Sequence, residues 1–303
     1  MDGEAASTKG NDAPMMRSMF AAISGLKSHQ IMMDVTANDI ANVNTIGYKS
    51  SRTTFADSLA QLQRGDAGQS PGQNNSNPAQ VGLSTQLGSI DNLMGGGALQ
   101  STGNATDLAI QGDGGGWFRV GSATLAGAVA TFTPGTEQYT QAGNFTRNDA
   151  GYLTTADGYY VIGRSVPSTT VTATPPGADQ LIQIPQGASS VAVGPDGAVS
   201  YIPAGSTTRT TAGYISLAKF PNENGLQRAS GNRWTANAAS GAEEIGTPGG
   251  DFGSTVSGEL EMSNVDLATE FTNMISAQRG FQANSRVITT ADDMLNDLVN
   301  MKH

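Results

Sequence analysis

Glycine and proline are distributed very unevenly along this chain of 303 residues, and this limits what each part can fold into. Residues 61–258 hold 34 of the 39 glycines and 11 of the 12 prolines. Residues 1–60 hold four glycines, and residues 259–303 hold one. Because glycine costs a helix about 1 kcal/mol and proline about 3 kcal/mol, long helices are restricted to the two ends. The sequence predicts an α+β protein, with helical ends around a glycine-rich antiparallel β region.

The N-terminal end carries a helical repeat over residues 16–44. Apolar residues recur in steps of three and four from Met16 to Ile40, which is the spacing of one helix face. The pattern lasts for about four heptads, as in a coiled coil. We therefore expect one long helix with a single apolar stripe, followed by a segment that reaches residue 62. Residues 1–15 form a separate extension, expected to be disordered.

The C-terminal end, residues 259–303, shows the same pattern. Leu267, Phe271, Met274 and Phe281 continue in similar steps to Ile288, and the stripe then shifts by one position toward Leu298. Ser263 or Asn264 could cap the start of this helix. A helix with one apolar stripe is not stable alone, so the stripe must pack against the other helix or against a neighbouring chain. Periodicity leaves both arrangements open: a helix hairpin in an ordinary globular protein, or an inner domain that packs between subunits.

We expect the packing residues of both stripes to act together in a coiled-coil-like inner domain. They are Met16, Met19, Phe20, Ile23, Leu26, Met33, Ala37, Ile40, Leu267, Phe271, Met274, Phe281, Ile288 and Leu298.

Residues 81–258 alternate short β-prone runs with turn signals, which predicts an antiparallel all-β domain. The runs at 138–145, 151–155, 159–162 and 213–220 are candidate strands. Asp157-Gly158 and Asp196-Gly197 are typical hairpin turns. Residues 63–80 are rich in Gly, Gln, Asn and Ser, as in a linker. Residues 164–212 could form a small excursion from the sheet.

The composition argues against most kinds of chemistry. With 16 Lys+Arg against 26 Asp+Glu, the net charge of −10 disfavours nucleic acid as a partner. There is no Cys and there are two His, which leaves few residues for a nucleophile or a metal site. The glycine run at 112–116 lacks the Lys-Ser/Thr of a phosphate-binding loop. We expect no catalytic residue, metal or cofactor. No apolar run is long enough to insert into a membrane.

Five motifs, taken in order, resemble the bacterial flagellar rod and hook proteins. The residues that carry the resemblance are 23–26 with 34–49, 102–112, 139–145, 259–267 and 274–285. The similarity runs from about residue 16 to residue 302. Within the family the chain looks most like a short hook protein. Residues 263–267, residues 280–284 and the spacing from 220–226 to Trp234 resemble hook versions. Distal-rod members usually carry an Ala-Tyr-Glu-like stretch after the Gln-Arg pair, which is Gln278-Arg279 here. The distal rod is the alternative.

The resemblance implies a structural subunit that polymerises into a curved tube, the flexible joint between rod and filament. It also implies partners: further copies of the chain, the distal rod, the hook cap, the hook–filament junction proteins and the type III export apparatus. The implied location is the extracellular flagellum, reached without a cleaved signal peptide. An enzyme that cleaves cell-wall glycans is a rival hypothesis, but no standout acidic pair supports it.

Two further features come from comparison with the family. Phe55 and Leu59 resemble its export-gate motif, in which Phe is followed four residues later by an apolar residue; an amphipathic tail after the first helix explains them equally well. The chain departs from the family pattern at Asp39, where Asn is usual, at the extra Gly115-Gly116, and in residues 1–14, which have no counterpart.

Overall fold

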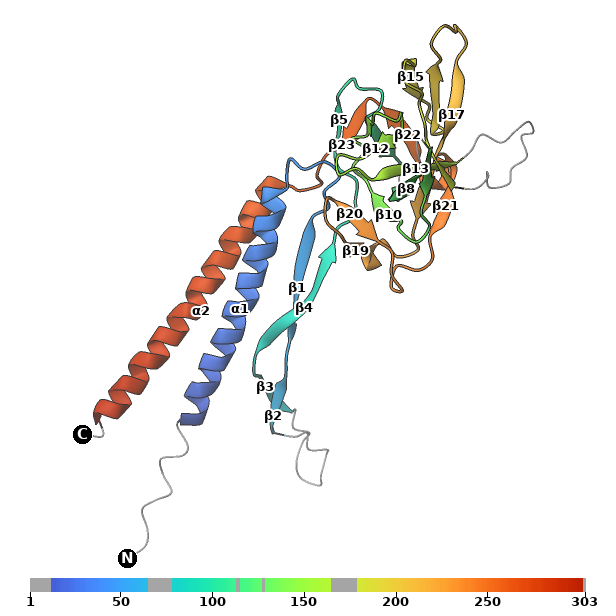
Figure 1. The fold of residues 1–303 in the computed structure, drawn as a ribbon. Helices are drawn as coiled ribbons and strands as arrows, with labels where there is room; N and C mark the ends of the chain where they lie inside the picture. The colour runs from blue at the N-terminus through green and yellow to red at the C-terminus, as the bar shows by residue number, and fades with distance from the viewer. Residues whose placement is uncertain (1–11, 65–77, 113–114, 127–128, 165–178, 302–303) are drawn as a thin grey trace, which may run out of the picture. The chain divides into compact units, whose positions relative to one another are not determined.

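A computed structural model describes residues 12–64, 78–112, 115–126, 129–164 and 179–301. The chain folds into a mixed α/β protein with a helix at each end and antiparallel strands between them (Figure 1). It divides into two compact units. Unit 1 comprises residues 1–41, 51–92 and 266–303, and unit 2 comprises residues 42–50 and 93–265.

Unit 1 contains two long helices and a two-stranded ribbon. Helix α1 spans Asp12–Ala41 and helix α2 spans Leu267–Met301. The two helices run antiparallel, side by side (Figure 1). The strands are β1 (Ser51–Asp57), paired with β4 (Thr85–Asn92), and β2 (Ala60–Arg64), paired with β3 (Ala79–Gly82). Residues 85–92, which we expected in the β domain, are therefore part of the ribbon beside α1.

Unit 2 is built around a sheet whose main strand order is β15-β16-β17-β13-β7-β10-β20-β19. Neighbouring strands in this order are antiparallel. Short strands extend this sheet or pair outside it. The strands of unit 2 are β5 (Leu99–Ser101), β6 (Leu108–Gln111), β7 (Trp117–Gly121), β8 (Ala123–Ala126), β9 (Val129–Phe132), β10 (Gln138–Thr140), β11 (Thr146–Arg147), β12 (Leu153–Thr154), β13 (Tyr160–Arg164), β14 (Asp179–Leu181), β15 (Ser189–Val193), β16 (Ala198–Ile202), β17 (Thr210–Ile215), β18 (Leu217–Lys219), β19 (Gln227–Arg228), β20 (Arg233–Thr235), β21 (Glu244–Gly246), β22 (Ser254–Ser257) and β23 (Glu259–Glu261). Two short 3₁₀ helices span Glu223–Gly225 and Gly250–Phe252.

Two buried clusters form the core of this unit. The larger one includes Leu108, Phe118, Val161 and Ile215, and the smaller one packs Trp117 edge-on against Trp234. All five residues of β7 are buried, because the larger cluster covers the face with Phe118 and Val120 and the smaller cluster covers the face with Trp117. Both tryptophans of the chain therefore lie in the core of unit 2.

The expected strand at 213–220 is in fact two strands that meet at Ser216. Strand β17 pairs with β16 and β13, whereas β18 pairs with β7 and β21. Ser216 is fully buried between them, and its carbonyl and hydroxyl oxygens accept hydrogen bonds from Arg119. The strand divides because the chain changes partners here.

Three predictions on segment boundaries fall partly outside the described residues. Residues 1–11 of the expected extension lie outside them, and α1 begins at Asp12. Residues 65–77 of the expected linker also lie outside the described residues. The two ends of that linker, residues 63–64 and 79–80, belong to β2 and β3. Residues 165–178 of the expected excursion also lie outside, and the remainder contributes β14, β15, β16 and the start of β17.

Candidate assembly surface

The two helices of unit 1 meet through small residues. Ala22 on α1 and Ala277 and Ala291 on α2 are buried. A Cβ atom on Gly25 would lie 2.7 Å from the side chain of Asn284, and one on Gly280 would lie 2.4 Å from the ring of His29. The absence of a side chain at these two positions leaves room for Asn284 and His29 between the helices.

The β1–β4 ribbon packs on a different side of α1. The backbone N–H of Thr85 donates a hydrogen bond to Ser24 Oγ, and the N–H of Ser51 donates one to Asp39 Oδ2 over 3.0 Å. Asp39 is fully buried. At this position, where the family usually has Asn, the carboxylate thus fixes the first residue of the ribbon against the end of the helix.

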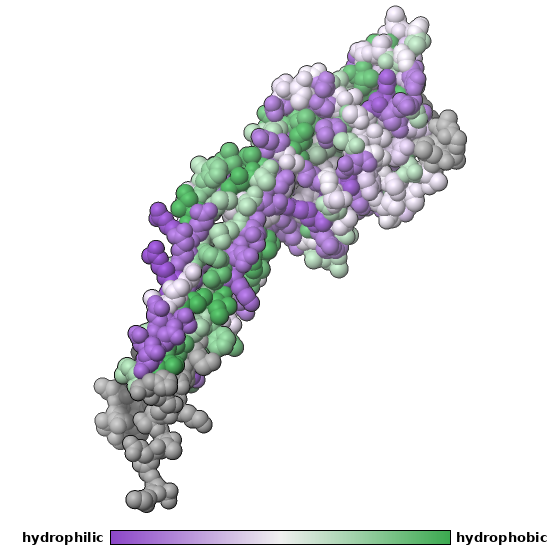
Figure 2. Space-filling model, turned by 60° about the vertical axis from the view of Figure 1, so that its left-hand side comes forward, coloured by the Kyte–Doolittle hydropathy of each residue, from purple (hydrophilic) through white to green (hydrophobic). Residues whose placement is uncertain are grey.

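Most of the predicted packing residues remain partly or largely accessible to solvent. Phe20 is 62% exposed, Phe271 50%, and Ile23 and Leu267 39% each. Ala37 is exposed, and Met19, Leu26, Met33, Ile40, Met274, Phe281 and Ile288 are half-buried. The side chains of Met16 and Leu298 lie outside the described residues. Figure 2 shows apolar and polar patches alternating along the helical unit.

These accessible residues share one side of the helix pair. At about 100° per residue, the stripe of Ile23, Leu26 and Met33 lies roughly a quarter turn from the contact residues Ala22 and Gly25. On α2, Leu267, Phe271 and Met274 are displaced by a similar angle in the same sense. The helices are antiparallel, so a stripe displaced from the contact by the same angle in the same sense on each helix falls on the same side of the pair. This side is opposite the ribbon. We call the predicted packing residues on this side the apolar face; they are Met19, Ile23, Leu26, Met33, Ala37, Leu267, Phe271, Met274, Phe281 and Ile288.

The start of α2 differs from the sequence prediction. Asp266 caps the helix, rather than Ser263 or Asn264, since its Oδ1 accepts a hydrogen bond from the N–H of Ala268. The hydrogen bond from Thr269 and that from Ala268 hold the pKa of Asp266 below its usual value. One turn later, burial raises the pKa of Glu270, and the nearby carboxylates of Asp39 and Asp266 raise it further.

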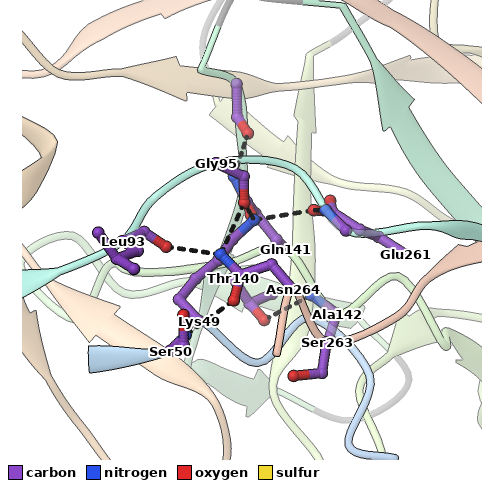
Figure 3. Close-up of polar contacts among 12 residues, drawn as sticks. Lys49, Ser50, Leu93, Gly95, Thr140, Gln141, Ala142, Glu261, Ser263 and Asn264 are labelled. Atoms are coloured by element: carbon purple, nitrogen blue, oxygen red, sulfur yellow. Dashed lines mark hydrogen bonds and ion pairs between the residues drawn. The ribbon is translucent and has the colours of Figure 1, made fainter. Parts of the chain in front are cut away.

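Unit 2 contains a buried polar cluster that joins three chain segments distant in sequence (Figure 3). Lys49 follows α1 in the chain, Gly95 and Gly97 follow β4, and Glu261 ends β23. The Nζ atom of Lys49 lies 2.8 Å from Glu261 Oε1 and donates to the carbonyl of Gly95 over 2.9 Å. The same carboxylate oxygen accepts the N–H of Gly97. We call these four residues the clasp.

Asn264 adds further bonds beside the clasp. Its Oδ1 accepts the N–H of Ser50, and its Nδ2 donates to the carbonyls of Leu93 and Gly95 (Figure 3). In addition, the guanidinium of Arg228 lies over the ring of Tyr48 and donates to the carbonyl of Lys49. Every polar atom named here has a partner, as buried polar groups require. The cluster fixes the segments after α1 and before α2 within unit 2.

The glycine run at 112–116 does not offer a phosphate-binding loop in its described part. Gly112, Gly115 and Gly116 line a pocket of about 350 Å³ together with Glu223 and Glu261. Burial raises the pKa of Glu223, and two carboxyl groups make this wall unsuitable for an anion. Gly115-Gly116 connects β6 with β7, which pair with different strands, so no hairpin register depends on it.

The two export-gate candidates and His29 lie in unit 1. Phe55 and Leu59 are both exposed, on β1 and just after it. His29 packs against Gly280, and its ring lies 6.3 Å from that of Phe55. Within the described residues, no group of three or more His, Asp or Glu side chains is placed to hold a metal ion. No helix among these residues is both long and apolar enough to cross a membrane.

Three family models match the chain. Residues 19–49 match the flagella basal body rod protein model, residues 109–201 the flagellar hook protein FlgE/F/G D1 domain, and residues 256–301 the flagellar basal body rod FlgEFG protein C-terminal model. A flagellar basal-body rod protein FlgG from Bacillus subtilis is 41% identical over 290 residues, covering 95% of this chain and all of the relative. The chain therefore belongs to the family of flagellar rod and hook proteins.

A rod protein and a hook protein from one organism can both be compared with this chain. The basal-body rod protein FlgG of Borreliella burgdorferi is 33% identical over 291 residues, covering 95% of this chain and 99% of the relative. The flagellar hook protein FlgE of the same organism is 26% identical, over an alignment of 442 positions that covers 95% of this chain and all of the relative. That alignment is longer than the chain itself, so the hook protein carries many additional residues.

These comparisons favour the rod alternative over our expectation of a hook protein. That expectation depended in part on a short stretch of α2 that includes Gly280. In the structure Gly280 lies against the ring of His29, so helix packing accounts for a glycine at this position.

Proposed function

We propose that this chain is a structural subunit of the distal rod of the bacterial flagellum. The observation that carries the proposal is its full-length similarity to rod proteins of nearly the same length. The hook protein from the same organism aligns only with long insertions. Membership of the rod and hook family supports a structural role for the chain rather than an enzymatic one.

The apolar face supplies the contact through which copies would assemble. Its large side chains stay accessible because small residues already complete the contact between α1 and α2. Exposed apolar area of this kind favours burial against another chain at about 25 cal/mol per Å². Contacts between different surfaces of successive copies do not close on themselves and generate a helical tube. The helix pair would form the coiled-coil-like inner layer, and unit 2 the outer layer.

The remaining functional expectations from the sequence belong to the same proposal. The partners are other copies of the chain, neighbouring rod and hook components, and the type III apparatus that exports the subunit to the flagellum. The absence of cysteine suits a chain that passes through a channel unfolded. Phe55 and Leu59 are the candidate residues for recognition of the unfolded chain by the export gate; both are exposed in the folded chain, so a role there does not conflict with core packing.

The straightness of the polymer distinguishes a rod from a hook. We expect the purified full-length chain to form straight tubes under conditions that promote polymerisation, because its relatives of matching length are rod proteins. Negative-stain electron microscopy measures the curvature directly, with a hook protein polymerised in parallel as the curved control. Curved tubes would contradict the assignment to the rod, and the absence of any polymer would contradict the structural role itself.

A further inference from the structure

The side of α2 that faces away from α1 carries an ordered row of charges. Arg279, Arg286, Asp293 and Asp297 follow one another in steps of seven, seven and four, so they lie on one face of the helix. All four are exposed. The buried Ala277 and Ala291, which meet α1, lie on the opposite side of α2. We call the four residues the charged stripe.

Nothing in the described part of the chain neutralises this stripe. Among the described residues, none of these four side chains forms an ion pair or a hydrogen bond; the hydroxyls of Thr289 and Thr290 donate only to the backbone carbonyl of Arg286. Within the helix, Arg286 and Asp293 are about 10 Å apart along the axis, farther than the spacing of four residues at which side chains on a helix pair.

We propose that the charged stripe is an ionic contact between two copies of this chain. Arg279 and Arg286 of one copy would face Asp293 and Asp297 of the next, displaced along the axis of α2. A single displacement of between 11 and 14 residues, roughly 16–21 Å, brings Arg286 near Asp297 and Arg279 near Asp293 at the same time, because the two ideal displacements differ by less than one turn. The inference rests on the proposed function, because it assigns a register to the polymer that function requires.

The order of the charges favours a second copy over other partners. A nucleic acid or an anionic surface would be attracted to the arginines but repelled by the aspartates one or two turns later. A copy of the same stripe, shifted lengthwise, is complementary to both halves. Because each copy carries a net charge of −10, copies repel one another. Local ion pairs then select the register in which opposite charges meet.

Charge exchange tests this contact. Arg279→Glu/Arg286→Glu leaves only negative charges on the stripe, and Asp293→Arg/Asp297→Arg leaves only positive ones. We expect each double variant to need a roughly tenfold higher concentration to polymerise at low salt, as for the loss of two exposed ion pairs. A 1:1 mixture of the two variants, and the fourfold variant with both exchanges, should polymerise like the original chain. Sedimentation measures the critical concentration.

The matched control is Ser276→Glu/Ala283→Glu, which adds two negative charges at exposed positions of α2 that lie off both the stripe and the apolar face, and should polymerise normally. Normal assembly of both double variants would overturn the ionic contact while leaving the proposed function intact. Failure of the fourfold variant and of the mixture to recover would also overturn it. By contrast, an original chain that never polymerises would contradict the proposed function itself.

Discussion

Replacing Leu267 and Phe271 by glutamate is expected to abolish tube formation while leaving both units folded. These side chains are 39% and 50% exposed in the single chain, so little of the intrachain packing depends on them. In the polymer they would be buried on the apolar face. Losing that burial costs about 1–2 kcal/mol per side chain and contact, and an unpaired carboxylate in an apolar contact costs more.

Because every subunit in the tube repeats this loss, polymer should be absent at concentrations many times above the normal threshold. Electron microscopy and sedimentation measure the outcome. The control is Ser276→Glu/Ala283→Glu, which adds the same charge at exposed positions on another side of α2. Normal tubes from Leu267→Glu/Phe271→Glu would show that the apolar face is not a subunit contact.

Lys49→Met is expected to destabilise unit 2 by about 3–5 kcal/mol, because it leaves the buried Glu261 carboxylate without its cation. The two side chains are 1% and 6% exposed, so water cannot replace the lost partner. Both tryptophans lie in unit 2, so tryptophan fluorescence during denaturant unfolding reports this unit alone. A loss below about 1 kcal/mol would mean that the clasp contributes little to stability.

Two further variants distinguish the loss of the ion pair from a general effect of removing a cation. Arg209→Met removes an exposed cation of unit 2 that bonds, among the described residues, only to the hydroxyls of Ser190 and Ser200, and should change stability by less than about 1 kcal/mol. Lys49→Met/Glu261→Leu removes both charges of the clasp and should recover most of the loss, since a buried pair replaced by apolar groups is often neutral.

The sequence predicted the positions of both helices, but it did not predict which residues of each helix contact the other. Apolar periodicity identifies a stripe without saying what covers it, and we expected large residues such as Leu26 and Phe281 to pack in part between the helices. The structure uses Gly25 and Gly280 there, with Asn284 and His29 packed over them. The two isolated glycines could have indicated this contact. A glycine inside a helix lowers its stability, so its presence there often has a packing reason.

In the β region, local turns were more predictable than strand partners. Gly158 and Gly197 adopt positive φ at the two dipeptides expected to turn. The division of a strand at Ser216 depends on neighbours from β7 and β13 that no local pattern reveals. The clasp likewise joins Lys49 to Glu261 across 212 residues. Both residues lie in motifs that we had singled out, yet sequence spacing gave no reason to pair them.

The accessibility of the apolar face before and after polymerisation tests the central claim most directly. The chain has no cysteine, so Ile23→Cys places a single thiol on this face and Arg209→Cys places one at an exposed position in unit 2. A maleimide should label both variants rapidly as monomers. In the polymer, we predict that the thiol at position 23 becomes protected while labelling at position 209 continues. Equal labelling of position 23 in monomer and polymer would contradict the assembly of this protein through its apolar face.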